Sequence, residues 1–415
     1  MRRPSILFMN RVYPPVRGAT GRVLQELAQS FAQEGWHVTV VTTGKTARKE
    51  LDGSVRVVRV KGPEKPSNVF AYFWIWVKML VTALRLKHRH LIVTMSDPPL
   101  VVVAGQIVAR VKKSRHINWC HDLYPDVMPS LDYKLPGFVM DALHGLSRRA
   151  MKSCEKVIVP GRCMARHLSM EDLSPRQVTM IPNWPDLALV SGAGAANTNK
   201  VAYPFHPPPD SGVRSYDELL KEGQRFRVLY AGNIGRAHPI DTILDAAEIL
   251  EREKSDIEFV FVGDGKRFDY IAQQRTERGL DNIRLLPWQP SGRLREMMES
   301  GDVHLVSMKE EAAGFLVPSK LYAALAVARP CIFIGPAQCE TAKVINDFHL
   351  GSVIAPGQAK ELAATIRDYR MSCEVWFSAQ GGAAHARDVF TPNASFEAWK
   401  ERAWDAVHDD FKVAS

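Results

Sequence analysis

Short runs of aliphatic and β-branched residues alternate with amphipathic stretches along the first half of the chain. A helical pattern follows the first of these runs, from about Val23 to Gln33. Apolar runs this continuous are typical of parallel strands that helices cover on both faces. We therefore expect strands at Ser5–Met9, His37–Thr43, Val55–Val60, Leu91–Met95, His116–Cys120, Lys156–Val159 and Val178–Ile181.

The alternation stops between Pro182 and Gln224 and then begins again. This interruption contains Ser191–Ala196 and Pro207–Asp210, whose small residues and prolines are typical of a linker. After it, a helix is expected near Ile240–Glu253. The further strands are expected at Phe226–Ala231, Ile257–Val262, Ile283–Leu286, Val303–Val306 and Pro330–Ile334.

Two such sets predict an α/β fold, with two Rossmann-like, doubly wound domains that face each other across a cleft. We expect an N-terminal domain over residues 1–183, a linker or excursion over 184–224 and a C-terminal domain over 225–393. The last amphipathic segment, 394–415, is expected to form a helix that packs back on the N-terminal domain. Ligands of such sheets bind beyond the carboxyl ends of the strands, so the loops there are expected to carry the chemistry.

The composition is that of a soluble globular protein: of 415 residues, 46% are hydrophobic and 24% are charged. The 54 Lys and Arg exceed the 45 Asp and Glu, and the net charge of +9 favours an anionic partner. Nucleic acid, nucleotide phosphates and an acidic membrane face all fit that charge. The six dispersed cysteines form no C-x-x-C, and the apolar run Ile6–Met9 is too short for a signal-peptide core. We expect a reduced, cytoplasmic protein.

The segment Gly314–Pro330 carries the strongest local signal for chemistry. Pro318 suits the first turn of a helix, which places Ser319 and Lys320 at its amino end. Free backbone N–H groups, the helix dipole and one ammonium together suit a diphosphate. The alternative is an ordinary helix start with a surface lysine.

The motif P-S-K-L-Y-x-x-L-A-x-x-R-P in this segment resembles the donor site of family 4 glycosyltransferases of the GT-B fold. Other segments resemble the same family in the same order along nearly the whole chain. The G-N-I-G-R-A-H and P-S-K forms are most similar to the bacterial exopolysaccharide and O-antigen branch, the colanic acid type. The other matching segments are Tyr13–Gly18, His121–Asp126, Ile181–Asp186, Tyr230–His238 and Phe261–Gly265.

The resemblance implies transfer of a sugar from a nucleotide-sugar donor, a UDP- or GDP-sugar, to a glycan or lipid-linked acceptor. It implies a retaining, metal-independent reaction without a cofactor, with the acceptor on the N-terminal domain and the donor on the C-terminal domain. We expect the catalytic residues to be His121, Lys320 and Arg236. The expected substrate-binding residues are Gly18, Thr20, Gly232, Asn233, Gly263, Ser319 and Glu311.

The chain departs from the family at the motif Glu-x7-Glu, whose second glutamate holds the ribose. Ala323 stands at that place, and Glu311 matches the first glutamate only with an insertion. The chain has no Asp-x-Asp, which counts against a metal-held diphosphate. By resemblance His121, directly after a strand, would contact the transferred sugar, whereas the alternative is a histidine that caps the next turn. Asp122 could orient His121 or cap the helix that follows.

Two basic amphipathic segments, Val69–Leu84 and Phe138–Lys152, lie in the first half. The first contains one charge, Lys78, and is too short to span a bilayer. It fits either an interfacial helix or a buried helix of the first sheet. An interfacial position would place the protein on the anionic inner face of the cell membrane, beside a polyprenyl-diphosphate-linked sugar acceptor.

Other functions stay open at this level. A nucleotide-sugar 2-epimerase shares the architecture, and Ala323 leaves room for a non-catalytic nucleotide-sugar-binding subunit. The basic residues form no aromatic-interleaved clusters, so we expect no nucleic-acid partner. A dehydrogenase is disfavoured because no G-x-G-x-x-G follows an expected strand.

Overall fold

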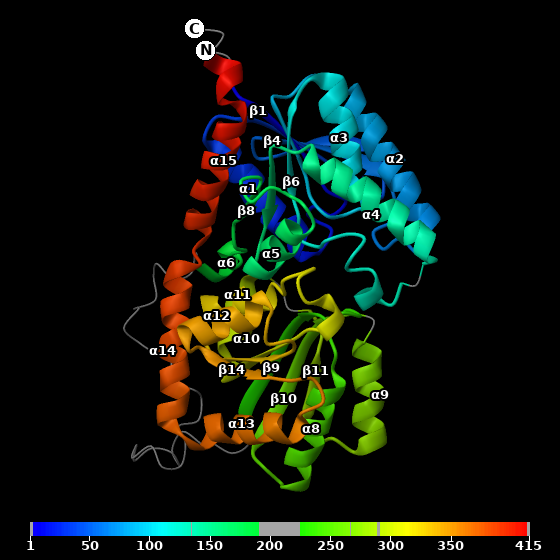
Figure 1. Ribbon diagram of the computed structural model, residues 1–415. Coiled ribbons are helices and arrows are strands. Elements are labelled where there is room, and N and C mark those ends of the chain that lie inside the picture. The colour runs from blue at the N-terminus through cyan, green and yellow to red at the C-terminus, as the bar shows by residue number, and fades with distance from the viewer. Residues whose placement is uncertain (1–2, 134, 191–224, 266, 289–290, 413–415) are drawn as a thin grey trace.

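A computed structural model describes residues 3–133, 135–190, 225–265, 267–288 and 291–412. Two mainly parallel sheets, each covered by helices on both faces, form two domains stacked one above the other in Figure 1. This confirms the predicted α/β fold with two Rossmann-like domains. The expected linker segments Ser191–Ala196 and Pro207–Asp210 lie outside the described residues.

The described part of the N-terminal domain contains an eight-stranded sheet in the order β3-β4-β2-β1-β5-β6-β7-β8. All neighbours are parallel except β3, which pairs antiparallel with β4 at one edge. The strand order reverses between β1 and β5, and such a switch point is where ligands of this fold class bind. The strands are β1 Ser5–Met9, β2 His37–Gly44, β3 Arg48–Asp52, β4 Val55–Lys61, β5 Leu91–Thr94, β6 Arg115–Trp119, β7 Lys156–Val159 and β8 Val178–Met180.

Alternate side chains of β1 enter two different cores, as the pleat of a strand requires. Ile6 and Phe8 pack with helix α1 and with the C-terminal helix α15 (Pro392–Lys412), while Leu7 and Met9 pack with helices α2 and α3. The two faces are therefore both covered, which explains the uninterrupted apolar run. The helices of this half are α1 Ala19–Gln33, α2 Val69–Arg85, α3 Val101–Lys112, α4 Gly137–Lys152, α5 Arg162–Met170, α6 Leu187–Val190 and the 3-10 turn η1 Pro129–Leu131.

The C-terminal domain holds a six-stranded parallel sheet in the order β11-β10-β9-β12-β13-β14 among its described residues. Numbered along this domain, that order is 3-2-1-4-5-6, which is the dinucleotide-binding Rossmann order. Its switch point lies between β9 and β12. The strands are β9 Phe226–Asn233, β10 Ile257–Asp264, β11 Ile283–Leu286, β12 Val303–Ser307, β13 Cys331–Ile334 and β14 Gly351–Ile354.

The helices of the second half complete both domains. The long C-terminal helix α15 leaves the C-terminal domain and runs along α1, where the rings of Trp36 and Trp404 lie 5.1 Å apart (Figure 1). Phe396 and Trp399 of α15 are buried in the core of the N-terminal domain. The helices are α8 Asp241–Arg252, α9 Phe268–Arg278, α10 Leu294–Glu299, α11 Lys320–Ala326, α12 Glu340–Phe348, α13 Ala359–Met371, α14 Cys373–Val389, α15 Pro392–Lys412 and the 3-10 turns η3 Ser291–Arg293 and η4 Glu310–Ala312.

The two domains touch through buried apolar side chains and backbone hydrogen bonds. Leu123 of the N-terminal domain and Val317 of the C-terminal domain belong to one continuous buried cluster. The backbone N–H of Leu123 donates to the carbonyl of Phe315 at 2.8 Å. Glu340, at the start of α12, accepts from the backbone N–H of Arg162 at 2.6 Å and from its Nε at 3.0 Å.

Candidate active site

The ends of β9 and β10 approach each other closely at two glycines. Gly232 and Gly263 are register partners with φ angles of 121° and 146°, a backbone conformation that favours glycine. A Cβ on Gly263 would lie 2.2 Å from the carbonyl oxygen of Gly232. The glycines therefore leave the carboxyl ends of β9 and β10 bare of side chains, next to the switch point between β9 and β12.

Lys320, the first residue of α11, extends over this bare edge. Its Nζ donates to the carbonyl of Asn233 at 2.9 Å and lies 3.3 Å from Nε2 of His238. The ammonium also lies 5.3 Å from the centre of the Tyr230 ring. Burial lowers the pKa of Lys320 to about 7, and no carboxylate of the described residues forms an ion pair with it.

His238 is held as a neutral ring beside this ammonium. Its Nδ1 lies 2.6 Å from the carbonyl of Ser307, so Nδ1 carries the proton and donates it. Nε2 is then left to accept from Lys320. Burial and the positive charge of Lys320 lower the pKa of His238 to about 3, so the ring is neutral at physiological pH.

Of the two basic residues of this loop, the structure brings His238 and not Arg236 to Lys320. Arg236 instead donates to the carbonyl of Leu131 at 3.2 Å and lies 5.8 Å from the ring of Tyr133, both in the N-terminal domain. These two contacts place Arg236 at the domain boundary.

The other donor-side candidates are spread along the segment before and within α11. The helix begins at Lys320 rather than at Pro318, and Ser319 is its N-cap without a side-chain hydrogen bond. Ala323 packs against the apolar cluster that contains Leu229 and Met298. Glu311 is exposed on η4. The place of the family's second glutamate is thus an apolar packing position in this chain.

On the N-terminal domain, His121 and Asp122 follow β6 and share one anchor. Their backbone N–H groups donate to Oγ of Ser96 at 2.8 and 2.9 Å. The His121 ring lies 4.7 Å from that of Trp119, and its Nε2 is buried without a hydrogen-bond partner among the described residues. Burial, with a smaller effect of Arg22, lowers the pKa of His121 to about 3.

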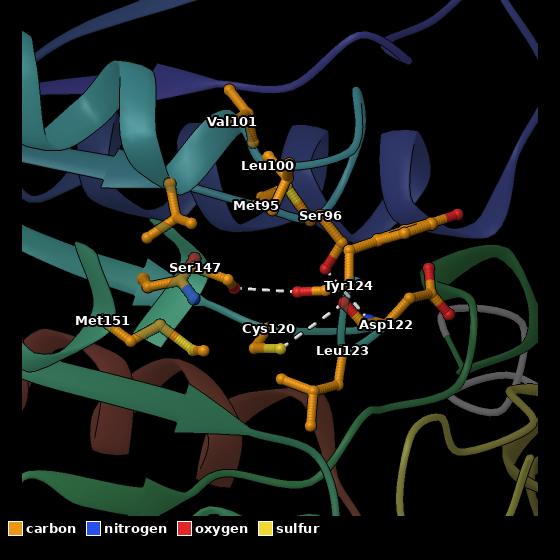
Figure 2. Close-up of a pocket in the computed structure, with 12 residues that line it drawn as sticks. Met95, Ser96, Leu100, Val101, Cys120, Asp122, Leu123, Tyr124, Ser147 and Met151 are labelled. Atoms are coloured by element: carbon orange, nitrogen blue, oxygen red, sulfur yellow. Dashed lines mark hydrogen bonds between the residues drawn. The ribbon is translucent and has the colours of Figure 1, made fainter. Parts of the chain in front are cut away.

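Asp122 lies where the two domains meet, because it forms an isolated β-bridge with Leu316. Burial, followed by the charge of Asp97, raises its pKa to about 6. Figure 2 shows the Asp122 and Tyr124 side chains pointing to one side, away from Met151. The cavity behind them has a volume of about 20 Å³, room for about one water molecule. A sugar does not fit there.

An ion pair that the sequence did not predict lies at the switch point of the first sheet. Arg11 follows β1 and Asp97 follows β5, and they meet in two 2.7 Å hydrogen bonds, Nε to Oδ1 and Nη2 to Oδ2. Arg11 also lies 5.7 Å from the centre of the Tyr72 ring of α2. The available signal was their place directly after two strands, which the resemblance did not point to.

Gly18 and Thr20 lie at the start of α1. Gly18 is the exposed N-cap, and Thr20 is half-buried in the first turn. A Cβ would lie 3.0 Å from Cγ1 of Val12 at Gly18 and 2.8 Å from it at Gly21, so both positions lie close to that side chain. Nearby, Arg17 lies 5.9 Å from the ring of Trp288 in the other domain. These residues border the domain boundary, and none of them contacts Lys320.

Over the described ranges, no group of three or more His, Cys, Asp or Glu side chains is placed to hold a metal ion. In the same part of the chain, no helix has both the length and the apolar character that crossing a membrane requires.

Two family models match the chain in sequence. The model described as Glycosyltransferase Family 4 matches residues 20–189, and the model described as Glycosyl transferases group 1 matches residues 215–370. WcaI of Escherichia coli (strain K12), named as a colanic acid biosynthesis glycosyl transferase, is 25% identical over 388 residues, covering 88% of this chain and 91% of WcaI. WbjE of Pseudomonas aeruginosa, named as a probable glycosyltransferase, is 24% identical over 330 residues, covering 79% of this chain and 76% of WbjE.

Solved structures share the whole fold at low sequence identity. Sucrose-phosphate synthase of Thermosynechococcus elongatus is similar with a TM-score of 0.75 at 16% identity, over 100% of both chains. Anabaena Alr3699/HepE in complex with UDP and glucose is similar with a TM-score of 0.66 at 16% identity, over 96% of this chain and 98% of that chain.

Proposed function

We propose that this chain, which belongs to the family 4 glycosyltransferases of the GT-B fold, transfers a sugar from a nucleotide-sugar donor in bacterial surface polysaccharide biosynthesis. The donor is a UDP- or GDP-sugar, and the acceptor is a glycan or a lipid-linked sugar. One observation carries the proposal: the Lys320 ammonium lies over a strand edge that two glycines keep bare. The names of WcaI and HepE, a colanic acid enzyme and a UDP complex, support it.

The contacts of Lys320 suit a diphosphate. An ammonium has three N–H donors, and two of them are directed to Asn233 and His238. The third is free to donate to a phosphate oxygen. A phosphate would also stabilise a buried charge that has no carboxylate partner, so donor binding would raise the pKa of Lys320 from about 7. The bare glycine edge allows the diphosphate to approach the backbone.

The chemistry then follows from where charge develops. The bond between the anomeric carbon of the sugar and the diphosphate oxygen breaks, and negative charge grows on the leaving diphosphate. Lys320 would bind that charge more strongly in the transition state than in the ground state, which lowers the barrier. In a retaining transfer the acceptor hydroxyl attacks from the side of the leaving group and gives its proton to the diphosphate.

His121 is the proposed contact to the transferred sugar. Its Nε2 is buried and has no partner among the described residues, and a sugar hydroxyl would supply one. Because its pKa is about 3, the ring is neutral and binds by hydrogen bonding rather than by charge.

The acceptor side includes a surface suited to a membrane. Phe70 and Trp74 of α2 are 77% and 58% exposed, and Phe138 of α4 is 77% exposed. In Figure 1 α2, α3 and α4 lie side by side on one face of the N-terminal domain. The ring of Tyr72, also on α2, lies 5.7 Å from the guanidinium of Arg11 at the switch point of the sheet. We propose that this face meets the anionic inner leaflet and leads a polyprenyl-diphosphate-linked acceptor to the site.

The test is a transfer assay with the purified chain. UDP-, GDP- and dTDP-sugars are incubated with lipid-linked glycans extracted from bacterial membranes, and the product linkage is determined by NMR. We expect one donor to give a retained anomeric linkage with the same rate in EDTA. An epimer formed from the donor alone, or nucleotide binding with no transfer to any acceptor, would contradict the proposal.

A further inference from the structure

A second pocket lies at the opposite end of the N-terminal sheet from the candidate active site. It opens at the amino ends of β1, β2 and β4, and its volume is about 300 Å³. We call it the basic pocket because three arginines and a histidine line it together with hydroxyl groups, and no carboxylate does. The residues that matter here are Arg3, His37, Thr39, Ser54, Arg56 and Arg89.

The arginines of the basic pocket have no carboxylate partner among the described residues, although they lie around one hollow. Within the described ranges, Arg3, Arg56 and Arg89 form no ion pair with a carboxylate. By contrast Arg59, on the same strand as Arg56, pairs with Glu50 through Nε at 2.5 Å. Three like charges around one hollow repel each other, and an anion in the hollow would relieve that repulsion.

Arg89 is fixed in place despite this repulsion. Its Nη1 donates to the carbonyl of His88 at 2.9 Å, and its Nη2 donates to Oγ1 of Thr39 at 3.2 Å. Thr39 is the register partner of Arg56, so its hydroxyl links the loop of Arg89 to the strand pair that carries Arg56. Nε of Arg89 is buried with no partner in the described structure. Burial and the nearby Arg56 both lower the pKa of Arg89. This direction is expected for a cation that has no anion beside it.

We propose that the basic pocket binds a phosphate group, as a phosphomonoester or a phosphodiester. Planar guanidinium groups match the oxygens of a phosphate, and the hydroxyls of Ser54 and Thr39 add neutral hydrogen-bonding groups. The volume is at the lower end of ligand-pocket sizes, so the phosphate carries a small attached group. The site is separate from the proposed diphosphate site, which lies on the C-terminal domain.

The phosphate has two sources that share this chemistry. A soluble phosphate ester would enter from solvent. An anionic phospholipid headgroup would enter from a membrane, to which the exposed Arg85 and Lys87, close to Arg89 in the chain, would be attracted.

The test compares two double variants of the full chain with equal charge change. Arg3→Ala with Arg56→Ala removes two exposed arginines of the basic pocket. Arg166→Ala with Arg176→Ala removes two exposed arginines elsewhere on the same domain, also without ion pairs among the described residues. Binding of inorganic phosphate and of glycerol 3-phosphate is measured by calorimetry at low ionic strength. Sedimentation with phosphatidylglycerol vesicles, against phosphatidylcholine vesicles, is the lipid arm.

We expect the pocket variant to weaken binding at least tenfold in one arm, and the control variant to bind within twofold of the unmodified chain. A loss with the soluble phosphates identifies a phosphate ester, and a loss only with phosphatidylglycerol identifies a lipid headgroup. Equal binding by both variants in both arms would overturn the proposal. Phosphate that binds at Lys320 does not confuse the outcome, because both variants retain that residue.

Discussion

Among single residues, the ammonium of Lys320 is the group on which the proposed chemistry depends. It was predicted from the P-S-K motif, and the structure places it with Gly232 and Asn233. The structure adds two partners, His238 and Tyr230, that hold it without neutralising it. A cation whose pKa is lowered by burial gains more from a phosphate partner than a solvated lysine does, because the phosphate stabilises the charge that burial disfavours.

The first prediction concerns pH. The pKa of Lys320 is about 7 in the free protein, and kcat/KM reports the free enzyme. We expect kcat/KM for the donor to fall as pH rises through about 7, because deprotonated Lys320 has no charge for the diphosphate. Lys320→Arg keeps its charge at all these pH values and should lose this fall, though its rate is lower. A pH profile of the arginine variant that falls in parallel with that of the unmodified chain would contradict the assignment.

Asp122 gives a second prediction. Its folded-state pKa of about 6 exceeds the ordinary 3.8, so the folded chain binds more protons than the unfolded chain between these values. The contribution of this carboxyl to stability is therefore present below about pH 4 and is lost as pH rises through 6. The free energy of unfolding of Asp122→Asn should therefore rise, relative to that of the unmodified chain, by on the order of 2 kcal/mol between pH 4 and pH 7. Urea denaturation at both pH values measures it, and an equal difference at both would refute the assignment.

At the scale of elements, hydrophobic periodicity was sufficient for strands buried on both faces and insufficient for two others. Arg48–Asp52 has no apolar run because β3 is an antiparallel edge strand with charged side chains. Gly351–Ile354 is four residues long and begins with glycine. Each is an edge strand of its sheet, paired with one neighbouring strand. The local sequence alone therefore does not predict either strand.

The helix at the candidate site shows the same limit. Pro318 suggested a helix start, but α11 begins two residues later and has seven residues. The start is decided by the packing of the preceding segment, since Leu316 and Val317 are buried against the other domain. Tertiary contacts of this kind override a local preference.

Helix α2 has features of both alternatives that its sequence left open, a buried helix and an interfacial helix. Ile75, Met79 and Ala83 are buried in the domain, while Phe70 and Trp74 are exposed. Phe70→Ser with Trp74→Ser should weaken binding to phosphatidylglycerol vesicles at least tenfold, because each large side chain contributes about 1.5–3 kcal/mol when it leaves water.

The melting temperature of this variant should stay close to that of the unmodified chain, because both side chains are exposed. The control is Met371→Ser with Val375→Ser, two exposed apolar residues of the C-terminal domain. If vesicle sedimentation is reduced equally by both double variants, the proposed membrane surface is wrong.

At the scale of the whole molecule, the sequence predicted two domains and a C-terminal helix packed on the first of them, but not the polar contacts between the domains. Arg236, predicted to be catalytic, donates to the carbonyl of Leu131 across the domain boundary, a contact that the sequence did not predict. Contacts such as that of Lys320 with Asn233 join positions 87 residues apart, and no local pattern records which of several basic residues will make them. The resemblance to the family indicated which segments form the site. Which side chains within these segments contact each other depends on the packing of the folded chain.

The domain contacts differ in burial, and their contributions to stability should differ accordingly. Glu340 is 4% exposed and accepts three hydrogen bonds from Arg162. Glu340→Ala leaves the backbone N–H and the Nε of Arg162 without their partner, while Nη1 of Arg162 keeps Asp347, and the change should cost about 2–4 kcal/mol. The pair of Lys65 and Asp264 is exposed, so Lys65→Ala should cost less than about 1 kcal/mol. Melting temperatures of the two variants measure this contrast, and equal shifts would show that the buried pair does not hold the domains together.

The most direct measurement is the rate of sugar transfer by Lys320→Ala beside Lys360→Ala, with the donor that the unmodified chain uses. Lys360 is an exposed lysine of α13 with no ion pair among the described residues, so its variant controls for loss of charge alone. We predict that kcat/KM falls by about 10²-fold or more in Lys320→Ala, because a charge contact to the leaving diphosphate is lost, and stays within twofold in Lys360→Ala. Transfer by Lys320→Ala at close to the unmodified rate would contradict the assignment of this lysine to the donor diphosphate.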